Sequence, residues 1–438
     1  MKQFAFMIVT TLLGVAGSFN STPLWGVAVY YLFGVLRPQS IWQWQELAGM
    51  QIADVGWSFY VAIAAILSTI LWRMGSISPI RVTATPWYGD PQYTRSHYLF
   101  LMFVFWVCLT YPTARNPDVS YPFFIEYVKI FCMFICSTFV LRTSSDLWVI
   151  FIVITCAVGY AGYEINSYYF LDGYMILQRR GYGGLDNNGA GLMLAMGVPL
   201  ALFAYEGMRH KIRWLFLLLV PFLLHAVMLS FSRGAMLSVL VCTPLIFLRA
   251  RSKRFIIVLF AGAAVFVVAA AGPEITERFL SIQEHEVDES ANARKNSWAI
   301  AIRMANEEPL FGFGIRNSNR YTYAYGADMS GRTIHSQYLQ TAADSGWVAL
   351  ALYLALLGST FLSGWQVHRF LLGHKDPESL RVRAMLSGLM CSLLIFCFGG
   401  FFLSLENFEL PYILILLLVQ LHAITRMIKN YLPAAVPR

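Results

Sequence analysis

Long apolar stretches joined by short polar connections make up most of the chain. A helix that crosses the hydrocarbon core of a membrane needs roughly 20 consecutive, mostly apolar residues. Stretches of suitable length and hydropathy lie near 4–20, 22–37, 54–73, 97–112, 120–141, 146–163, 187–205, 212–230, 233–249, 254–271, 345–368, 383–403 and 409–427. This pattern predicts an all-α polytopic membrane protein with about twelve to fourteen transmembrane helices.

One polar segment, 272–344, interrupts this pattern and divides the sequence. It separates an N-terminal transmembrane bundle, 1–271, from C-terminal transmembrane helices, 345–438, and we expect one integrated membrane domain. Long loops in compact proteins are usually functional or disordered, and the aromatic residues of this loop argue against disorder. We therefore expect a large, partly helical and functional loop.

The loop contains a stretch with helical periodicity, residues 294–304. Its apolar members Trp298, Ala301 and Ile302 recur at a spacing of three and four residues. Side chains at this spacing share one face of a helix. The pattern predicts an amphipathic helix that lays this face on the membrane domain.

The composition agrees with a lipid environment rather than with nucleic-acid binding. Charged residues make up 13% of the sequence and hydrophobic residues 58%, whereas soluble domains carry about 25% charged residues. The net charge of +8 reflects basic residues that stand in short connections between apolar stretches. Such residues act as topology signals in membrane proteins, so we expect membrane lipid and no nucleic acid as a partner.

Four basic connections define the expected orientation. They lie at 209–213, at 249–254, between residues 369 and 383, and in the tail with Arg426 and Lys429. If these connections are cytoplasmic, the segments 164–186, 230–233 and 272–344 face the opposite side of the membrane. The sequence thus predicts that the polar residues suited to chemistry gather on the non-cytoplasmic face.

Two arginine sites on that face are candidates for binding an anion. Arg233 lies in a turn between two very apolar helices, where a charge is costly unless it is paired or lines a water-filled cavity. Arg179 and Arg180 precede three glycines that allow close backbone approach, and Asn188 follows. Arginine suits phosphate because its planar fork matches two phosphate oxygens. The alternatives are that Arg233 snorkels to the interface and that the Asp/Asn cluster only caps the next helix.

The polar loop adds three candidates, Arg278, Arg294 and His335. His335 stands just before a predicted transmembrane helix, on the face that holds the arginines. Histidine is the side chain best suited to accept a proton from a hydroxyl near neutral pH, although a lone histidine is more often structural. Between the two loop arginines we favour Arg294 as a phosphate ligand, for its spacing to Trp298.

Motifs for nucleotide or metal binding do not occur in the sequence. It contains no Walker-type phosphate-binding loop and no zinc-protease motif. The glycines of 312–314 lack a strand–turn–helix context, and the histidine of 284–286 lacks a second histidine at helical spacing. We therefore expect no metal, no cofactor and no nucleotide.

Several short motifs resemble those of the O-antigen ligase and polymerase superfamily of bacterial envelope enzymes. They are Ser232-Arg233-Gly234-Ala235, Arg294 four residues before Trp298, the run from Pro309 to Gly314, His335 to Leu339 followed by Asp344-Ser345-Gly346, and upstream Arg180-Gly181 through Asn188. Each motif is short, but their order and spacing over residues 175–350 are fairly specific. Residues 1–53 carry no motif that maps onto the family.

This resemblance implies a metal-independent glycosyl transfer at the periplasmic face of the bacterial inner membrane. Such enzymes move a glycan from an undecaprenyl-diphosphate carrier to an acceptor hydroxyl, and the carrier diphosphate is the leaving group. By this resemblance His335 accepts the proton of the acceptor. The residues expected to hold the diphosphate are Arg180, Arg233 and Arg294, with Arg179, Arg278 and Asn188 as additional candidates.

The acceptor separates the functions that the superfamily covers. We expect an O-antigen ligase, whose acceptor is the lipid A core oligosaccharide in lipopolysaccharide biosynthesis. The alternatives are an O-antigen or exopolysaccharide polymerase, whose acceptor is another carrier-linked glycan, and a protein O-oligosaccharyltransferase. A polysaccharide or lipid transporter is a different class, and it is disfavoured because the polar residues concentrate on one face and in one loop. A scaffold without catalysis is a third class.

Overall fold

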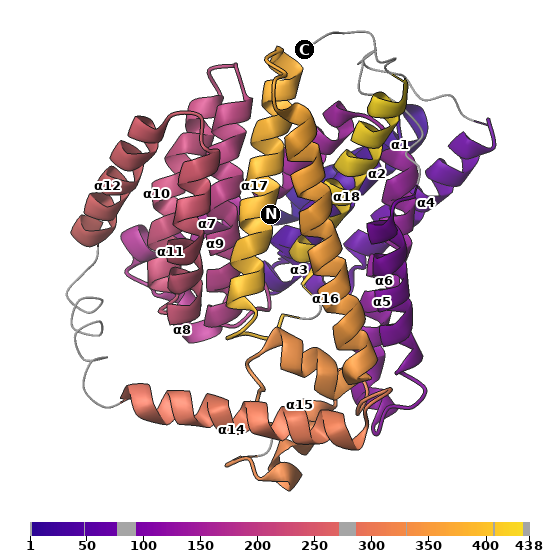
Figure 1. The fold of residues 1–438 in the computed structure, drawn as a ribbon, viewed down its shortest axis with the longest axis vertical. Helices are drawn as coiled ribbons and strands as arrows, with labels where there is room; N and C mark the ends of the chain where they lie inside the picture. The colour runs from indigo at the N-terminus through magenta and orange to yellow at the C-terminus, as the bar shows by residue number, and fades with distance from the viewer. Residues whose placement is uncertain are drawn as a thin grey trace.

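The computed structural model describes residues 2–47, 49–76, 93–270, 286–329, 331–405 and 408–431. These residues form helices almost throughout, and the long helices of the bundle run along a common direction (Figure 1). In the described part of the chain, the one sheet is a short antiparallel pair, β1 (Glu46–Leu47) and β2 (Met50–Gln51). The predicted all-α class is confirmed.

The helices correspond one by one to the predicted apolar stretches, with additional short helices between them. The first half contains α1 (Lys2–Asn20), α2 (Leu24–Leu36), α3 (Pro38–Ile41), η1 (Ile52–Asp54), α4 (Trp57–Arg73), α5 (Arg95–Leu109), α6 (Pro117–Val140), α7 (Ser144–Asp172), α8 (Ile176–Arg180) and α9 (Asn187–Gly207). The second half contains α10 (Arg213–Leu229), α11 (Arg233–Arg249), α12 (Lys253–Ala270), α14 (Glu286–Glu307), α15 (Ser318–Tyr321), η2 (Thr322–Tyr325), α16 (Gln337–Leu371), α17 (Pro377–Gly399) and α18 (Glu409–Tyr431).

Eight helices among the described residues are long and apolar enough to cross a membrane. They are α1, α4 together with η1, α6, α7, α9, α16, α17 and α18, and α5 and α10 are shorter apolar helices. This supports a polytopic membrane protein. The number is lower than the twelve to fourteen spans expected from hydropathy. The helices α2, α5, α10 and α11 have only 13, 15, 17 and 17 residues, and α12, with 18 residues, is also not among the eight.

Helix α9 lies at the centre of the bundle. All of its residues from 189 to 204 are buried, and it packs against α7, α10, α11 and α17. This stretch has no charged side chain and is rich in glycine and alanine. Small residues let neighbouring helix backbones approach closely, which is how helices gain packing energy in lipid. The position of α9 therefore fixes where its N-terminus meets the surrounding turns.

The predicted amphipathic helix of the loop is α14, which lies across one end of the bundle (Figure 1). It packs against α16. Its residues Ile300, Ala301 and Met304 are buried in a small apolar core together with Phe313 and Ile334. The face that contacts the rest of the protein thus follows the three- and four-residue spacing expected of a helix.

The prediction is wrong for one residue of the buried face of α14, Ile302. Ala301 is buried and Trp298 is half-buried against the same core, but 41% of the surface of Ile302 is exposed. Ile302 and Trp298 lie on a neighbouring stripe, whereas Ile300 and Met304 point directly at the core. The spacing correctly predicted the helix, but the predicted centre of its apolar face lies about one residue from the observed centre.

Helix α16 begins at Gln337, eight residues before the predicted apolar stretch 345–368. Its first turns carry buried polar side chains, which lower the hydropathy there. Gln340 donates from Nε2 to Oδ2 of Asp344 at 2.7 Å, and the carboxylate also accepts the backbone N–H of Ser318 at 2.9 Å. The loop residue Ser318 thus bonds to both side chains, accepting from Nε2 of Gln340 at 2.7 Å as well, so the helix extends beyond its apolar part.

Gly346 bends α16 where the helix leaves the loop. Its φ of 82° is left-handed, and the backbone N–H of the next residue, Trp347, donates to the carbonyl oxygen of Pro309 at 2.8 Å. A Cβ atom at Gly346 would lie 2.1 Å from the carbonyl oxygen of Leu310. Only glycine fits this close approach of two backbones.

We expect Gly346→Ala to lower the free energy of unfolding by about 1–3 kcal/mol, because it combines a left-handed backbone with a steric clash. Thermal denaturation of the detergent-solubilised protein measures this. Gly358→Ala is the matched control, since it lies in the same helix and a Cβ there meets no atom within 4 Å. The control is expected to be as stable as wild type or slightly more stable. Equal stability of the two variants would contradict the strained bend.

Candidate active site

Segments that are far apart in the sequence meet at the end of the bundle covered by α14. Asn187 at the start of α9 donates from Nδ2 to the carbonyl oxygen of Ser230, in the turn before α11, at 3.0 Å. The backbone N–H of Gln337 at the start of α16 donates to the carbonyl oxygen of Gly400, after α17, at 2.7 Å. Figure 1 shows α14 across this same end. The turns that carry the predicted site residues therefore face one common layer.

The turn before α11 presents Arg233 as the first residue of the helix. Ser232 caps the helix by accepting the backbone N–H of Ala235 at 3.3 Å, and Phe231 has a left-handed backbone with φ 51°. The Arg233 side chain is exposed. The N-terminus of a helix carries partial positive charge and unsatisfied N–H groups. A cationic side chain at this position adds to that field, and the combination favours an anion.

Arg294 reaches the same region from α14. Its side chain is half-buried, and burial together with the charge of Arg233 lowers its pKa. Among the residues that the structure describes, neither arginine has an acidic partner within ion-pair distance. Two neighbouring guanidinium groups repel each other, and a bound phosphate would relieve this repulsion, so the pair suits a polyanion.

His335 lies within electrostatic range of Arg294 and has an unusual backbone. Its φ of 56° is left-handed, a conformation that is uncommon outside glycine and is concentrated at functional sites. Its side chain is half-buried. Burial and then the charge of Arg294 lower the pKa of His335, and the carboxylate of Asp186 acts in the opposite direction. A lowered pKa keeps the imidazole neutral at neutral pH, which is the form that accepts a proton.

The sequence analysis did not identify two charged residues, Asp186 and Arg332, as neighbours of His335. Asp186 was identified only as a possible helix cap, and it does cap α9 by accepting the backbone N–H of Gly189 at 2.7 Å. Its charge also acts on His335, as does that of Arg332. Arg332 pairs with Asp328 at 3.5 Å. No sequence signal reveals these proximities, because they arise from contacts between distant segments.

Arg179 and Arg180 end α8 on the same side of the bundle, and both are exposed. Arg179 lies over the ring of Tyr174, with its guanidinium carbon 5.6 Å from the ring centroid. Arg180 lies within electrostatic range of Tyr168. Within the described ranges, neither arginine forms a hydrogen bond or ion pair with Arg233, Arg294 or His335. Their predicted role as diphosphate ligands stays a prediction.

The glycines after Arg180 form a tight turn. Tyr182 and Leu185 exchange backbone hydrogen bonds of 2.9 and 3.0 Å, and the two residues between them, Gly183 and Gly184, have φ of 60° and 75°. Such paired left-handed residues define a two-residue hairpin turn. The turn brings the chain directly into Asp186 and α9, which positions the carboxylate beside His335.

The remaining predicted candidates are Asn188 and Arg278. Asn188 is half-buried and donates from Nδ2 to Oδ1 of Asn187 at 3.3 Å, so its amide supports the first turn of α9. Arg278 lies outside the described residues. In the described part of the chain, no group of three or more His, Cys, Asp or Glu side chains is placed to hold a metal ion.

Arg37 is a further arginine that the sequence analysis did not single out. It lies between α2 and α3 with a left-handed φ of 54°. Its side chain runs along the glycine turn, because a Cβ at Gly184 would lie 3.7 Å from its Nη1. Burial lowers the pKa of Arg37, and the charges of Glu126 and Glu409 counteract this. Arg37 thus contacts the glycine turn and lies within electrostatic range of the carboxylates of Glu126 and Glu409.

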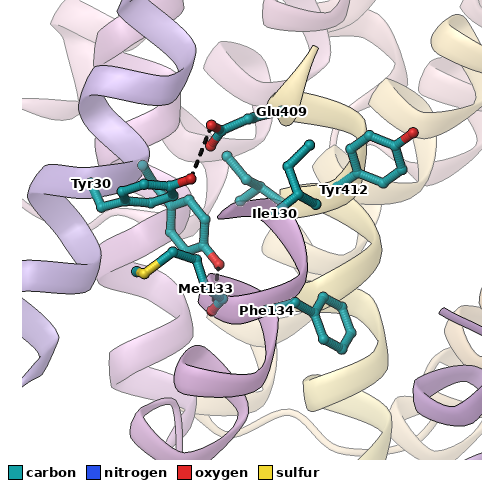
Figure 2. A pocket seen from close by; sticks show the side chains of 8 residues that line it. Tyr30, Ile130, Met133, Phe134, Glu409 and Tyr412 are labelled. Atoms are coloured by element: carbon teal, nitrogen blue, oxygen red, sulfur yellow. Dashed lines mark hydrogen bonds between the residues drawn. The ribbon is translucent and has the colours of Figure 1, made fainter. Parts of the chain in front are cut away.

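Figure 2 shows the pocket around one of these carboxylates, Glu409. Tyr30 donates its hydroxyl hydrogen to Oε1 of Glu409 at 3.1 Å. The other labelled side chains around it are Ile130, Met133, Phe134 and Tyr412. The cavity has room for about 10 Å³, which corresponds to a single water molecule. It holds a buried polar pair and is too small for a sugar or a phosphate.

A larger polar cleft opens between the segment that follows α2 and the middle of α6. Its volume is about 480 Å³. The side chains that line it with polar groups are Gln39, Ser40, Gln43, Asp54, Ser58 and Lys129, and Phe59 adds an aromatic ring that is 55% exposed. Ser40 also contacts the glycine turn, since a Cβ at Gly184 would lie 3.4 Å from its Oγ. The cleft therefore adjoins the segment that leads to Asp186.

A family model described as O-antigen ligase matches residues 215–354 of the chain. The matched part includes Arg233, Arg294 and His335 but not Arg180 or Asp186. It extends from α10 into the first half of α16. The match confirms the resemblance to the O-antigen ligase superfamily. No curated protein matches the chain.

We expect Arg294→Gln to raise the pKa of His335, because the charge of Arg294 is one of the causes that lower it. Diethyl pyrocarbonate modifies neutral imidazole, so the pH profile of His335 modification, followed by peptide mass spectrometry, reports this pKa. The half-point is expected at higher pH in the variant. Lys295→Gln is the control, since it removes the same charge from the exposed neighbouring position. Identical modification profiles for wild type and Arg294→Gln would contradict the effect of the Arg294 charge on the pKa of His335.

Proposed function

We propose that this member of the O-antigen ligase superfamily transfers a glycan from undecaprenyl diphosphate to the lipid A core oligosaccharide. The observation that carries the proposal is the half-buried His335 within range of Arg294, which in turn neighbours Arg233, with neither arginine paired to an acid among the described residues. A proton acceptor next to a polyanion site fits an acceptor hydroxyl that displaces a diphosphate. The family match over this region supports it.

In this mechanism His335 acts as the general base. A hydroxyl oxygen of the acceptor attacks the anomeric carbon of the donor glycan, and its proton passes to the imidazole. The bond between the anomeric carbon and the diphosphate oxygen breaks, and the electron pair stays on the diphosphate. Asp186 stabilises the imidazolium that forms, because its carboxylate favours the protonated state of His335. The proton then leaves to solvent, which restores the neutral base.

Arg233 and Arg294 stabilise the departing diphosphate. Their charges are present before the reaction begins, so no reorganisation is needed as negative charge grows on the leaving group. We expect the reaction to proceed without a metal ion and without a nucleotide. The exposed Arg180 at the end of α8 and its neighbour Arg179 are proposed to meet the diphosphate or the first sugar from the other side of the glycine turn, with Arg278 as an additional ligand.

The orientation in the membrane is proposed from the distribution of basic residues. The connections that contain Arg209 and Arg251 lie at the end of the bundle opposite His335, because α9 and α11 start at the site and finish there. Short basic connections remain in the cytoplasm. We therefore propose that the site faces the periplasm in the inner membrane of a bacterium, with the polyprenyl tail of the donor between apolar helices.

The polar cleft beside the glycine turn is proposed as the glycan subsite. Planar amides, hydroxyl groups and an exposed aromatic ring are the groups that bind sugars, and the cleft offers Gln43, Ser40 and Phe59. Its position next to the segment that carries Asp186 places a bound glycan near His335. The same cleft serves a polymerase, whose acceptor is a second carrier-linked glycan, and the assay below separates these functions.

We expect His335→Ala and Arg233→Ala each to reduce transfer at least about 100-fold, since one removes the base and the other a leaving-group ligand. The measurement uses purified protein in nanodiscs with an undecaprenyl-diphosphate glycan and lipid A core, without added metal or nucleotide. His210→Ala and Arg209→Ala are matched controls, because both residues are exposed at the opposite end of the bundle. Wild-type transfer in His335→Ala and Arg233→Ala would falsify the mechanism and support a scaffold.

The product of the same assay identifies the acceptor. Glycan on the lipid A core supports the ligase. Lengthening of the glycan on the carrier means a polymerase, and transfer to a peptide serine or threonine means a protein O-oligosaccharyltransferase; either replaces the proposed acceptor but keeps the chemistry. Movement of intact donor across a sealed vesicle without any transfer replaces the proposal with transport.

We expect Gln43→Ala to raise the KM for the glycan that occupies the cleft about tenfold and to leave kcat nearly unchanged, because it removes a hydrogen bond to a bound sugar. Initial rates at varied donor and varied acceptor show which KM rises and so which glycan binds there. Gln45→Ala is the control, since Gln45 lies two residues along the chain and outside the cleft lining. If neither KM changes in Gln43→Ala, the cleft is not a glycan subsite.

A further inference from the structure

A second cleft lies at the end of the bundle opposite His335. It has a volume of about 550 Å³ and is formed where α9, α11 and α16 end and α17 begins. Four basic side chains line it, Arg249, Arg251, His368 and Arg383, and one acidic side chain, Glu206. The three arginines outnumber the one acidic side chain, which gives the cleft a positive charge that the proposed transfer reaction does not use.

Several hydrogen-bond donors in this cleft are buried without a partner. Within the described part of the chain, Arg249 Nη1, Arg383 Nε and His368 Nδ1 have no hydrogen-bond partner. Buried polar atoms in native proteins are almost always satisfied by protein, water or ligand. Arg249 and Arg383 are also the charges that act on His368. Three unsatisfied nitrogen atoms from three helices therefore surround one space, which points to an anionic ligand with several oxygen atoms.

The side chain of Arg383 and the backbone of Arg251 are held in place independently of a ligand. Arg383 donates from Nη2 to the carbonyl oxygens of Leu371 and His374, at the end of α16. The backbone N–H of Arg251 donates to Oε1 of Glu206 at 2.9 Å. The cation of Arg383 thus complements the negative end of a helix dipole, and its Nε remains free to bind an anion. The site is preorganised, which favours binding.

The rim of the cleft is apolar on the side away from the bundle. Leu245, Leu248 and Leu380 line it, and Leu248 is 70% exposed. An exposed leucine on a helix of a membrane bundle faces lipid. A ligand that fits both parts has a phosphate group at the arginines and hydrocarbon along the leucines. These are the two parts of a phospholipid.

We propose that this cleft binds the headgroup of an anionic phospholipid from the cytoplasmic leaflet. Basic pockets between transmembrane helices on the cytoplasmic side are typical binding sites for such headgroups. The short connections that form the cleft are the basic ones that mark this side. The site is separate from the proposed catalytic residues, and the proposal does not depend on the identity of the transferred glycan.

Native mass spectrometry of the delipidated full-length protein with phosphatidylglycerol tests this assignment. We expect Arg249→Gln to weaken phosphatidylglycerol binding about tenfold, because it removes the cation and a buried unpaired donor. Arg251→Gln is a second variant. Its side chain is on the surface, so we expect this substitution to disturb folding less. Arg369→Gln is the matched control, since Arg369 is exposed at the same end and contacts Trp365 instead of the cleft. It is expected to bind like wild type.

Two further arms decide the ligand class. Glu206→Gln removes the one acidic side chain of the lining and is expected to tighten phosphatidylglycerol binding several-fold. Phosphatidylcholine, whose headgroup is zwitterionic, is expected to bind at least tenfold more weakly than phosphatidylglycerol. Equal binding of the two lipids, or unchanged binding in both arginine variants, overturns the proposal. If millimolar inorganic phosphate displaces all of the bound lipid, the proposal is overturned in favour of a soluble phosphate compound as the ligand.

Discussion

The burial of α9 on all sides is the constraint on which the candidate site depends. Because α9 is packed against α7, α10, α11 and α17, its N-terminus has one position, and Asp186 is held there as the cap. The hydrogen bond from Asn187 to Ser230 ties the same N-terminus to the turn that carries Arg233. The carboxylate beside His335 and one of the two arginines are therefore positioned by a single apolar helix.

Apolar packing also allows two like charges to remain close together. At a protein surface, two unit charges separated by 4 Å repel by about 4 kcal/mol. Arg294 is held beside Arg233 by α14, whose Ile300 and Met304 are buried with Phe313 in a small core. Burying each of these large side chains contributes about 1.5–3 kcal/mol. This core holds α14, and with it Arg294, in place near Arg233.

The sequence predicted the helices well because hydropathy reports directly on burial in lipid. It failed at the start of α16, where Gln340 and Asp344 are polar but form hydrogen bonds with Ser318 from the loop. It also placed Ile302 on the buried face of α14, because spacing defines a face without saying which side chain is central. Arg233, Arg294 and His335 were identified from the sequence as polar residues on the predicted non-cytoplasmic face. Asp186 as a partner of His335 was not, since that proximity exists only in the folded chain.

The uncharged character of α9 has a consequence for how the protein is made. A chain enters the membrane from its N-terminus, and α17, which covers one side of α9, is synthesised long after it. Until then that side of α9 is exposed to acyl chains. Its stretch 189–204 has no charged side chain. The helix is therefore stable in lipid before α17 inserts and needs no chaperoning partner. The end of the bundle that carries the candidate site is thus completed late in biogenesis, when the last helices insert around α9.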